Sequence, residues 1–150
     1  MSGYNTVVVG TDGSRPSMHA VERAAWIAAA SDAKLIIAMA YVHHREDDQP
    51  VVEDFLKGEG YQVHGGAPNY EWLHEARERA EAAGAKKIED RAIVGTPVDV
   101  LVNLVQEAKA DLLVVGNLGM STLKGRLLGS VPASVTHRAQ TDVLVVHTRD

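Results

Sequence analysis

The stretch LLVVGNLGMSTLKGRLLGSVPASVTHRAQTDVLVVH, residues 112–147, decides the fold of this chain. It opens with the apolar run Leu112–Val115 and closes with a second run, Val143–His147. Between them lie a glycine-containing loop and a segment with helical spacing, Ser130–Ala139. Continuous apolar runs are typical of strands that are covered on both faces, as in a parallel sheet. The order strand, helix, strand therefore predicts two parallel strands joined by a right-handed crossover.

The same alternation continues from this stretch back to the N-terminus. Further strands are predicted at Thr6–Val9, Leu35–Tyr41 and, from a more mixed run, Lys87–Val94. Helices with one apolar side are predicted at Ser14–Ala30, Pro68–Ala83 and Pro97–Ala108. The sequence thus predicts one α/β domain over residues 1–150, in which a five-stranded parallel sheet of the Rossmann-like type has helices on both faces.

Composition narrows the class of protein. The 150 residues carry a formal net charge of −5, which argues against a nucleic-acid binder. There is no cysteine, so a disulfide framework and a thiolate zinc site are both excluded. The longest wholly apolar run, Leu35–Val42, is too short to span a membrane, and the N-terminus lacks the pattern of a secretory signal. We therefore expect a cytoplasmic protein with no nucleic-acid or membrane partner.

Residues 43–67 interrupt the alternation. The segment begins with the polar run HHREDDQP and continues with several glycines, which predicts a long, mobile surface loop. Its position after a strand end suggests the hypothesis of a lid over a ligand. The pair His43-His44 stands near three acidic residues, but no regular spacing organises them, so we interpret them as a solvated loop and predict no metal site.

Two glycine-containing loops follow the first and fourth predicted strands. They are Gly10–Ser14 and Gly116–Gly119, and the second leads on to Gly129-Ser130 before the last helix. In doubly wound sheets, ligands bind at the carboxyl ends of the strands where the winding direction reverses. Glycine lets the backbone approach a ligand closely, and a helix N-terminus presents unpaired N–H groups to an anion. The two loops are therefore the predicted ligand site.

The spacing Gly116-x2-Gly119-x9-Gly129-Ser130 resembles the G-2x-G-9x-G-(S/T) signature of ATP-binding universal stress proteins. The opening run VVVGTDGS is similar to that family as well, and the resemblance extends over essentially the whole chain. It implies an adenine nucleotide alpha hydrolase-like fold with strand order 3-2-1-4-5. It also implies a homodimer through the closing strand, Val143–His147, and a nucleotide-binding role in stress response or signalling without catalysis.

The resemblance also implies which residues line the nucleotide. Asp12 would contact the adenosine, Ala40 would pack on the adenine, and the signature glycines would surround the phosphates. The full predicted set is Val9, Gly10, Thr11, Asp12, Ala40, Val115, Gly116, Gly119, Gly129, Ser130 and Val131. Two alternatives stay open for these residues: Asp12-Gly13 as a simple turn with Asp12 bonded to its own backbone, and Ser130 as a helix cap.

Asn117 and Leu118 depart from the family pattern. The family commonly has a small hydroxyl residue followed by a basic one at these positions. A charge-assisted contact is worth about 1.5–3 kcal/mol, so its loss would weaken binding of a polyphosphate. Asn117, Lys124 and Arg126 are candidates for further phosphate contacts. The sequence leaves open whether the ligand is ATP, with or without Mg²⁺, or cyclic AMP.

Other functions compete with this hypothesis. A nucleotide-free dimeric scaffold of the same fold and a weak ATPase are both retained as alternatives. No Ser–His–Asp arrangement or paired carboxylate is recognisable, so we assign no catalytic residue and do not expect an enzyme. A receiver-like switch would need clustered acids after the first strand, where Asp12 stands alone. We expect Trp26 and Trp72 to serve in packing, and His147 to be structural.

Overall fold

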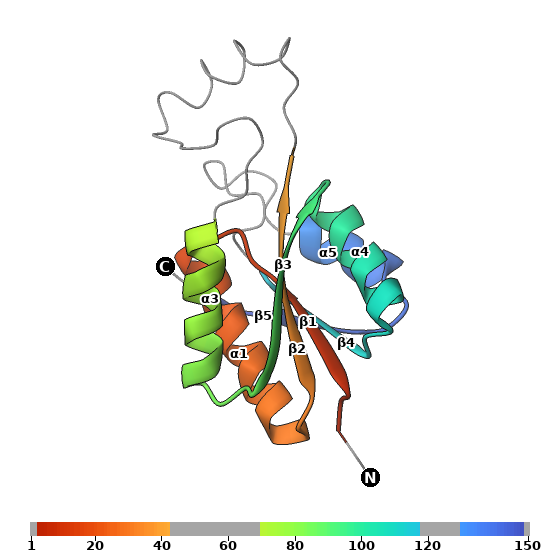
Figure 1. Ribbon diagram of the computed structural model, residues 1–150. Helices are drawn as coiled ribbons and strands as arrows, with labels where there is room; N and C mark the ends of the chain where they lie inside the picture. The colour runs from red at the N-terminus through yellow and green to blue at the C-terminus, as the bar shows by residue number, and fades with distance from the viewer. Residues whose placement is uncertain (1–2, 43–69, 118–129, 149–150) are drawn as a thin grey trace.

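The computed structural model describes residues 3–42, 70–117 and 130–148, and all five predicted strands lie within these ranges. Strands and helices alternate along the chain (Figure 1). The strands are β1 (Thr6–Gly10), β2 (Lys34–Tyr41), β3 (Lys87–Val94), β4 (Leu112–Gly116) and β5 (Asp142–Val146). The helices are α1 (Arg15–Ser31), α3 (Tyr70–Ala82), α4 (Pro97–Ala108) and α5 (Ser130–Arg138). The predicted bounds of β3 and α4 are the same as these, and those of the other elements differ by at most two residues at either end.

The strands form one parallel sheet in the order β3-β2-β1-β4-β5, which confirms the predicted topology. β1 is central because it pairs with β2 on one side and with β4 on the other. β2 and β3 pair over eight residues, from Lys34↔Lys87 to Tyr41↔Val94. The chain thus winds outward from β1 to one edge, returns to β4, and winds to the other edge.

Each face of the sheet has its own hydrophobic core because successive strand residues point to opposite faces. Val7 and Val9 of β1 pack with α1 and α3, whereas Val8 between them packs with α4 and α5. Figure 1 shows the two pairs of helices on opposite sides of the sheet. Both faces of β1 and β4 are buried, which explains why these strands read as unbroken apolar runs.

Local sequence signals fix the ends of the helices beside the sheet. Ser14 caps α1, accepting a hydrogen bond from the backbone N–H of Ser17, and Pro16 stands in the first turn, where a missing N–H costs nothing. Pro97 likewise lies in the first turn of α4, as its first residue. The C-cap residues that follow the two helices, Asp32 and Lys109, adopt the left-handed conformation with φ of 54° and 55°.

Some predictions concern residues that the structure does not describe. The surface loop 43–67, with its lid hypothesis, falls outside the described ranges. Among the helices of residues 3–42, 70–117 and 130–148, none is long and apolar enough to cross a membrane.

Candidate functional site

The two central strands separate at their carboxyl ends. The last residue pair between β1 and β4 is Val9↔Val114. The ladders on either side run further, to Gly10↔Ala38 between β1 and β2 and to Gly116↔Val146 between β4 and β5. Beyond this point β1 leads into α1 on one face, while the chain after β4 returns as α5 on the other (Figure 1). This is the switch point at which doubly wound sheets bind their ligands.

Thr11 anchors the turn that follows β1. It is fully buried, and its backbone N–H donates to the carbonyl of Ala38 at 2.9 Å. Its Oγ1 accepts from the N–H of Gly13 at 3.1 Å and lies 2.7 Å from Oγ of Ser17. Because the Ser17 hydroxyl donates to the Ser14 carbonyl at 2.9 Å, the Thr11 hydroxyl is the donor to Ser17. Thr11 therefore holds the turn, and its contact with a ligand stays a prediction.

Asp12 closes the turn with one carboxylate oxygen. Oδ1 accepts from the backbone N–H of Ser14 at 2.9 Å, so the interpretation as a self-bonded turn is confirmed. Oδ2 has no hydrogen-bond partner among the described residues, and the side chain is only partly buried. An ionised carboxylate accepts several hydrogen bonds. The turn and a ligand contact are therefore compatible, and Oδ2 is the oxygen that can accept from a ribose hydroxyl.

Trp72 of α3 lies against this turn. Gly13 has a φ of +85°, and a Cβ built on it would lie 2.3–2.7 Å from Cδ2, Cε3 and Cγ of the indole. Only glycine fits here, both for the backbone conformation and for the space. Sequence reasoning assigned Trp72 to general packing and missed its position at the candidate site, because nothing in a helical pattern shows which loop an aromatic ring will meet.

The site ends of β4 and β5 are tied together by Asn117. Its backbone N–H donates to the carbonyl of Val146 at 2.9 Å. Its Oδ1 accepts from the backbone N–H of Thr148 at 2.7 Å and from the Thr148 hydroxyl at 2.9 Å. Its Nδ2 lies 3.4 Å from Nδ1 of His147. The predicted phosphate contact of Asn117 stays a prediction, and the side chain would have to loosen these bonds to make it.

The apolar residues of the predicted set lie beneath the site. The side chains of Val9 and Val115 are buried in the two different cores, and their contact with a ligand stays a prediction. Val131, at the start of α5, is buried beside Val115. Ala40 is half-buried and stands two residues beyond Ala38, the partner of Gly10, so β2 projects past the end of β1.

The remaining predicted residues cannot be placed. Gly119, Lys124, Arg126 and Gly129 lie outside the described residues. Ser130 is the first residue of α5, but its side chain is not described. Gly10 and Gly116 are buried and form the last residues of β1 and β4, whereas the sequence predicted them as the first residues of the following loops. The described part of the site therefore consists of the turn after β1, the ends of β2 and β4, and the start of α5.

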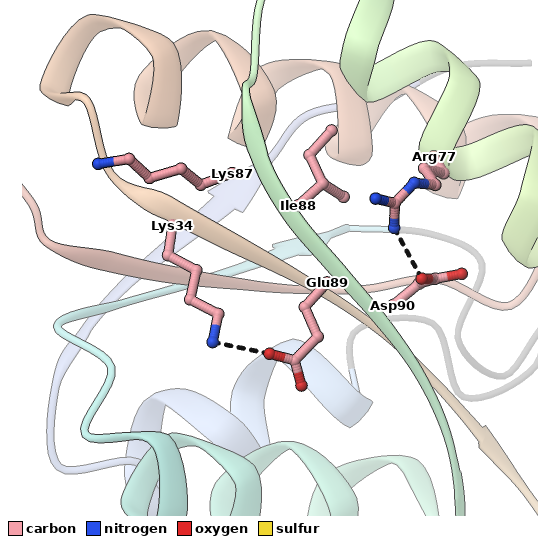
Figure 2. A pocket seen from close by; sticks show the side chains of 6 residues that line it. All are labelled: Lys34, Arg77, Lys87, Ile88, Glu89 and Asp90. Carbon is pink, nitrogen blue, oxygen red and sulfur yellow. Dashed lines mark hydrogen bonds and ion pairs between the residues drawn. The ribbon is translucent and has the colours of Figure 1, made fainter.

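A depression of about 490 Å³ lies elsewhere, along the outer edge of β3. Figure 2 shows two ion pairs among its charged side chains: Lys34 Nζ lies 2.7 Å from Glu89 Oε1, and Arg77 Nη1 lies 2.9 Å from Asp90 Oδ1. The remaining lysine, Lys87, pairs with Asp32 outside the depression, at 3.5 Å. Hydrogen bonds from Lys34 and Arg91 hold the pKa of Glu89 below its ordinary value. With their charges already matched, these residues form an ion-pair network rather than a ligand site.

A second depression, of about 400 Å³, crosses the exposed side of α1 and ends beside β5. Trp26 lines it together with Val146 and His147. Across the parts of the chain that the structure describes, no group of three or more His, Cys, Asp or Glu side chains is arranged to hold a metal ion.

Known proteins resemble this chain in sequence over its full length. A sequence model of the Universal stress protein family matches residues 3–147. Universal stress protein Rv1636 of Mycobacterium tuberculosis is 66% identical over 148 residues, covering 99% of both chains.

Solved structures resemble it as well. A universal stress protein in complex with cAMP has a TM-score of 0.74 and 55% sequence identity, with 99% of this chain and 100% of that chain covered. The universal stress protein from Archaeoglobus fulgidus in complex with dAMP has a TM-score of 0.66. At 21% identity over 95% of this chain and 97% of that one, its likeness concerns the fold alone.

Proposed function

The chain belongs to the universal stress protein family, and we propose that it binds an adenine nucleotide where β1 and β4 separate. One observation carries the proposal: the acidic turn after β1, with Asp12 Oδ2 unpartnered among the described residues, adjoins the glycine end of β4 at the switch point. The adenosine would lie against Asp12 and Ala40, and the phosphate near Gly116 and the start of α5. A relative of 55% identity was solved in complex with cAMP, which supports this ligand class.

Cyclic AMP is the preferred ligand in this proposal, ahead of ATP. The position after Gly116 holds the neutral Asn117, whose amide is engaged with Thr148 and His147. The start of α1 offers little to a polyphosphate, since Pro16 lacks an N–H and Ser17 N–H is capped by Ser14. A single phosphate needs fewer charge-assisted donors than three. Lys124 and Arg126 remain candidates for phosphate contacts, and ATP with Mg²⁺ is the competing ligand.

The role that we propose is binding and release without chemistry, in signalling or nucleotide buffering in the cytoplasm. The two buried hydroxyls beside the site, on Thr11 and Ser17, bond to each other rather than to a base that would activate them. Weak ATP hydrolysis is the alternative within this site.

We also propose that the protein is a homodimer paired through β5. β5 is an edge strand of the described sheet, and Val145 on it is 39% exposed. An apolar strand edge normally receives a partner or a cover. A nucleotide-free dimeric scaffold is the second candidate function, favoured by the turn after β1, in which Thr11 and Ser17 already satisfy one another without a ligand.

Isothermal titration calorimetry of the nucleotide-stripped protein tests the proposal, with cyclic AMP and with ATP plus Mg²⁺ in separate titrations. The key variant is Asp12→Asn, because its amide oxygen still accepts from Ser14 N–H while its NH₂ replaces the second acceptor. A lost hydrogen bond to a charged group costs about 1.5–3 kcal/mol, so we expect about 10- to 100-fold weaker binding. Asp32→Asn, the same change at the far end of α1, is the matched control and should bind as the wild type does.

The outcomes separate the candidates. Tighter binding of cyclic AMP than of ATP supports the proposal, and the reverse order assigns the site to ATP. If neither nucleotide gives a heat of binding, the nucleotide-free scaffold would be left as the function. Binding that is equal in Asp12→Asn, Gly116→Val and wild type would contradict the proposed site, because the ligand would then lie elsewhere. Release of inorganic phosphate from ATP would contradict the non-catalytic role.

A further inference from the structure

Trp72 and Gly13 come from different elements and meet at the edge of the candidate site. The indole ring lies so close to the Gly13 backbone that no side chain fits between them. Trp72 is 37% exposed, whereas the α3 residues Leu73 and Ala76 beside it are buried in the core. The ring therefore lies at the rim of the core, with the turn after β1 as a neighbour.

The contact restrains the turn from outside while hydrogen bonds restrain it from within. On the inner side, Thr11 Oγ1 accepts from Gly13 N–H, and Asp12 Oδ1 accepts from Ser14 N–H. On the outer side, the indole packs on Gly13, the residue between Asp12 and Ser14. A peptide held on both sides has few alternative conformations, and a loop that is ordered before binding loses less entropy when the ligand arrives.

We propose that Trp72 is a positioning residue of the nucleotide site, which fixes the turn carrying Asp12 by packing on Gly13. This inference rests on the proposed function, since it names a residue of α3 that prepares the same site. Trp72 acts through the turn, so its effect is on affinity for the nucleotide rather than on the choice of fold. The positive φ of Gly13 and the indole ring packed on it then act together to fix the conformation of this turn.

The test compares the two tryptophans of the chain. Trp26 is the matched control because it is 61% exposed and lies on α1 about 18 Å from Ser14, at a rise of about 1.5 Å per residue. We expect Trp72→Ala to bind cyclic AMP about tenfold more weakly, the cost of ordering a loosened turn. Trp72→Phe keeps a flat ring on Gly13 and should recover most of the affinity, and Trp26→Ala should bind as the wild type does.

Fluorescence gives a second measurement that a purely structural role would leave unchanged. In Trp26→Phe the emission comes from Trp72 alone, and in Trp72→Phe from Trp26 alone. We expect cyclic AMP to change the emission of the first variant and not of the second. Thermal unfolding of each variant, followed by circular dichroism, identifies any loss of the fold itself.

The results distinguish this inference from the function on which it rests. Weak binding in Trp72→Ala, with recovery in Trp72→Phe, supports the positioning role. Equal affinities in Trp72→Ala, Trp26→Ala and wild type would overturn it while leaving nucleotide binding intact. Absence of binding in the wild type would overturn the proposed function first, and the role of Trp72 with it.

Discussion

The two outer strands of the sheet, β3 and β5, differ in what they present at their edges. β3 carries Glu89 and Arg91 on the face of α4, where Arg91 Nη1 lies 2.8 Å from Glu107 Oε1 and Glu89 pairs with Lys34. β5 carries Val143 and Val145 at the same i, i+2 spacing, and Val143 packs in the core beneath α4 and α5. One edge is thus covered with paired charges, and the other with aliphatic side chains.

The difference indicates that the edges have opposite roles. Charged side chains on an edge strand discourage pairing with another chain, because pairing would strip water from the charges. β5, in contrast, carries no charged side chain apart from Asp142, its first residue. The same sheet therefore protects one edge and leaves the other free to pair, which is the arrangement that a dimer through β5 requires.

The largest effect is expected when a charge is introduced on the edge strand β5. Val145→Lys places two like charges near each other across a two-fold axis, which costs several kcal/mol. We expect the dimer Kd to rise about a hundredfold or more, giving a monomer in size-exclusion chromatography with light scattering. Val94→Lys is the matched control, since Val94 is a 48% exposed valine at the end of β3. A dimer that survives Val145→Lys, or a wild type that is monomeric, would contradict pairing through β5.

A smaller effect is expected where β5 meets the candidate site. Asn117→Ala removes the acceptor for both donors of Thr148, a residue that is only 2% exposed. Buried donors without a partner cost about 1–3 kcal/mol, so the free energy of unfolding in urea should fall by about that amount. Asn103→Ala, on the exposed side of α4, should change it little. A similar loss in both variants would show that the bonds of Asn117 to the end of β5 add no stability.

A third prediction makes β3 resemble β5. Glu89→Val with Arg91→Val replaces the charged pair by the aliphatic spacing of Val143 and Val145. Each new apolar cross-strand pair contributes about 0.2–1 kcal/mol. We therefore expect weak self-association that grows with concentration, measured by light scattering. The control Glu75→Val with Arg79→Val makes the same exchange on α3, which has no free strand edge. Association in the control alone, or in neither variant, would contradict a protective role for the charges.

The contrast between the edges also shows what the sequence could predict. The buried strands were predictable because Val7–Val9 and Leu112–Val115 are covered on both faces and so are apolar throughout. β3 reads KIEDRAIV, a mixed pattern, and none of its residues is fully buried, so polar side chains are tolerated along the strand. Its prediction succeeded on the alternation of elements rather than on hydrophobicity. The strand order followed from the family resemblance.

Side-chain contacts between distant residues were not predictable in the same way. The turn at Asp12 is local, so its Asx bond to Ser14 was among the interpretations of the sequence. Trp72 on Gly13 and Thr148 on Asn117 join residues far apart in the chain. Neither hydrophobic periodicity nor a sequence motif predicts such contacts, because the contacts depend on how the helices and strands pack together. The position of His147 beside Asn117 was missed for the same reason.

The smallest expected effect concerns how the guarded edge responds to acid. Hydrogen bonds from Lys34, and then from Arg91, keep the pKa of Glu89 below its ordinary value of 4.5. A carboxyl whose pKa is lowered by folding stabilises the native state above its unfolded pKa, and that contribution is lost as the pH falls through the folded value. Partly exposed ion pairs contribute about 0–1 kcal/mol. Wild type should therefore exceed Glu89→Gln in free energy of unfolding by at most that amount near neutral pH, and the difference should shrink below pH 4.5. Urea unfolding of both proteins across this range measures it. A difference that stays constant into acid would mean that the charge of Glu89 stabilises nothing, and that its role at the edge is confined to repelling a partner strand.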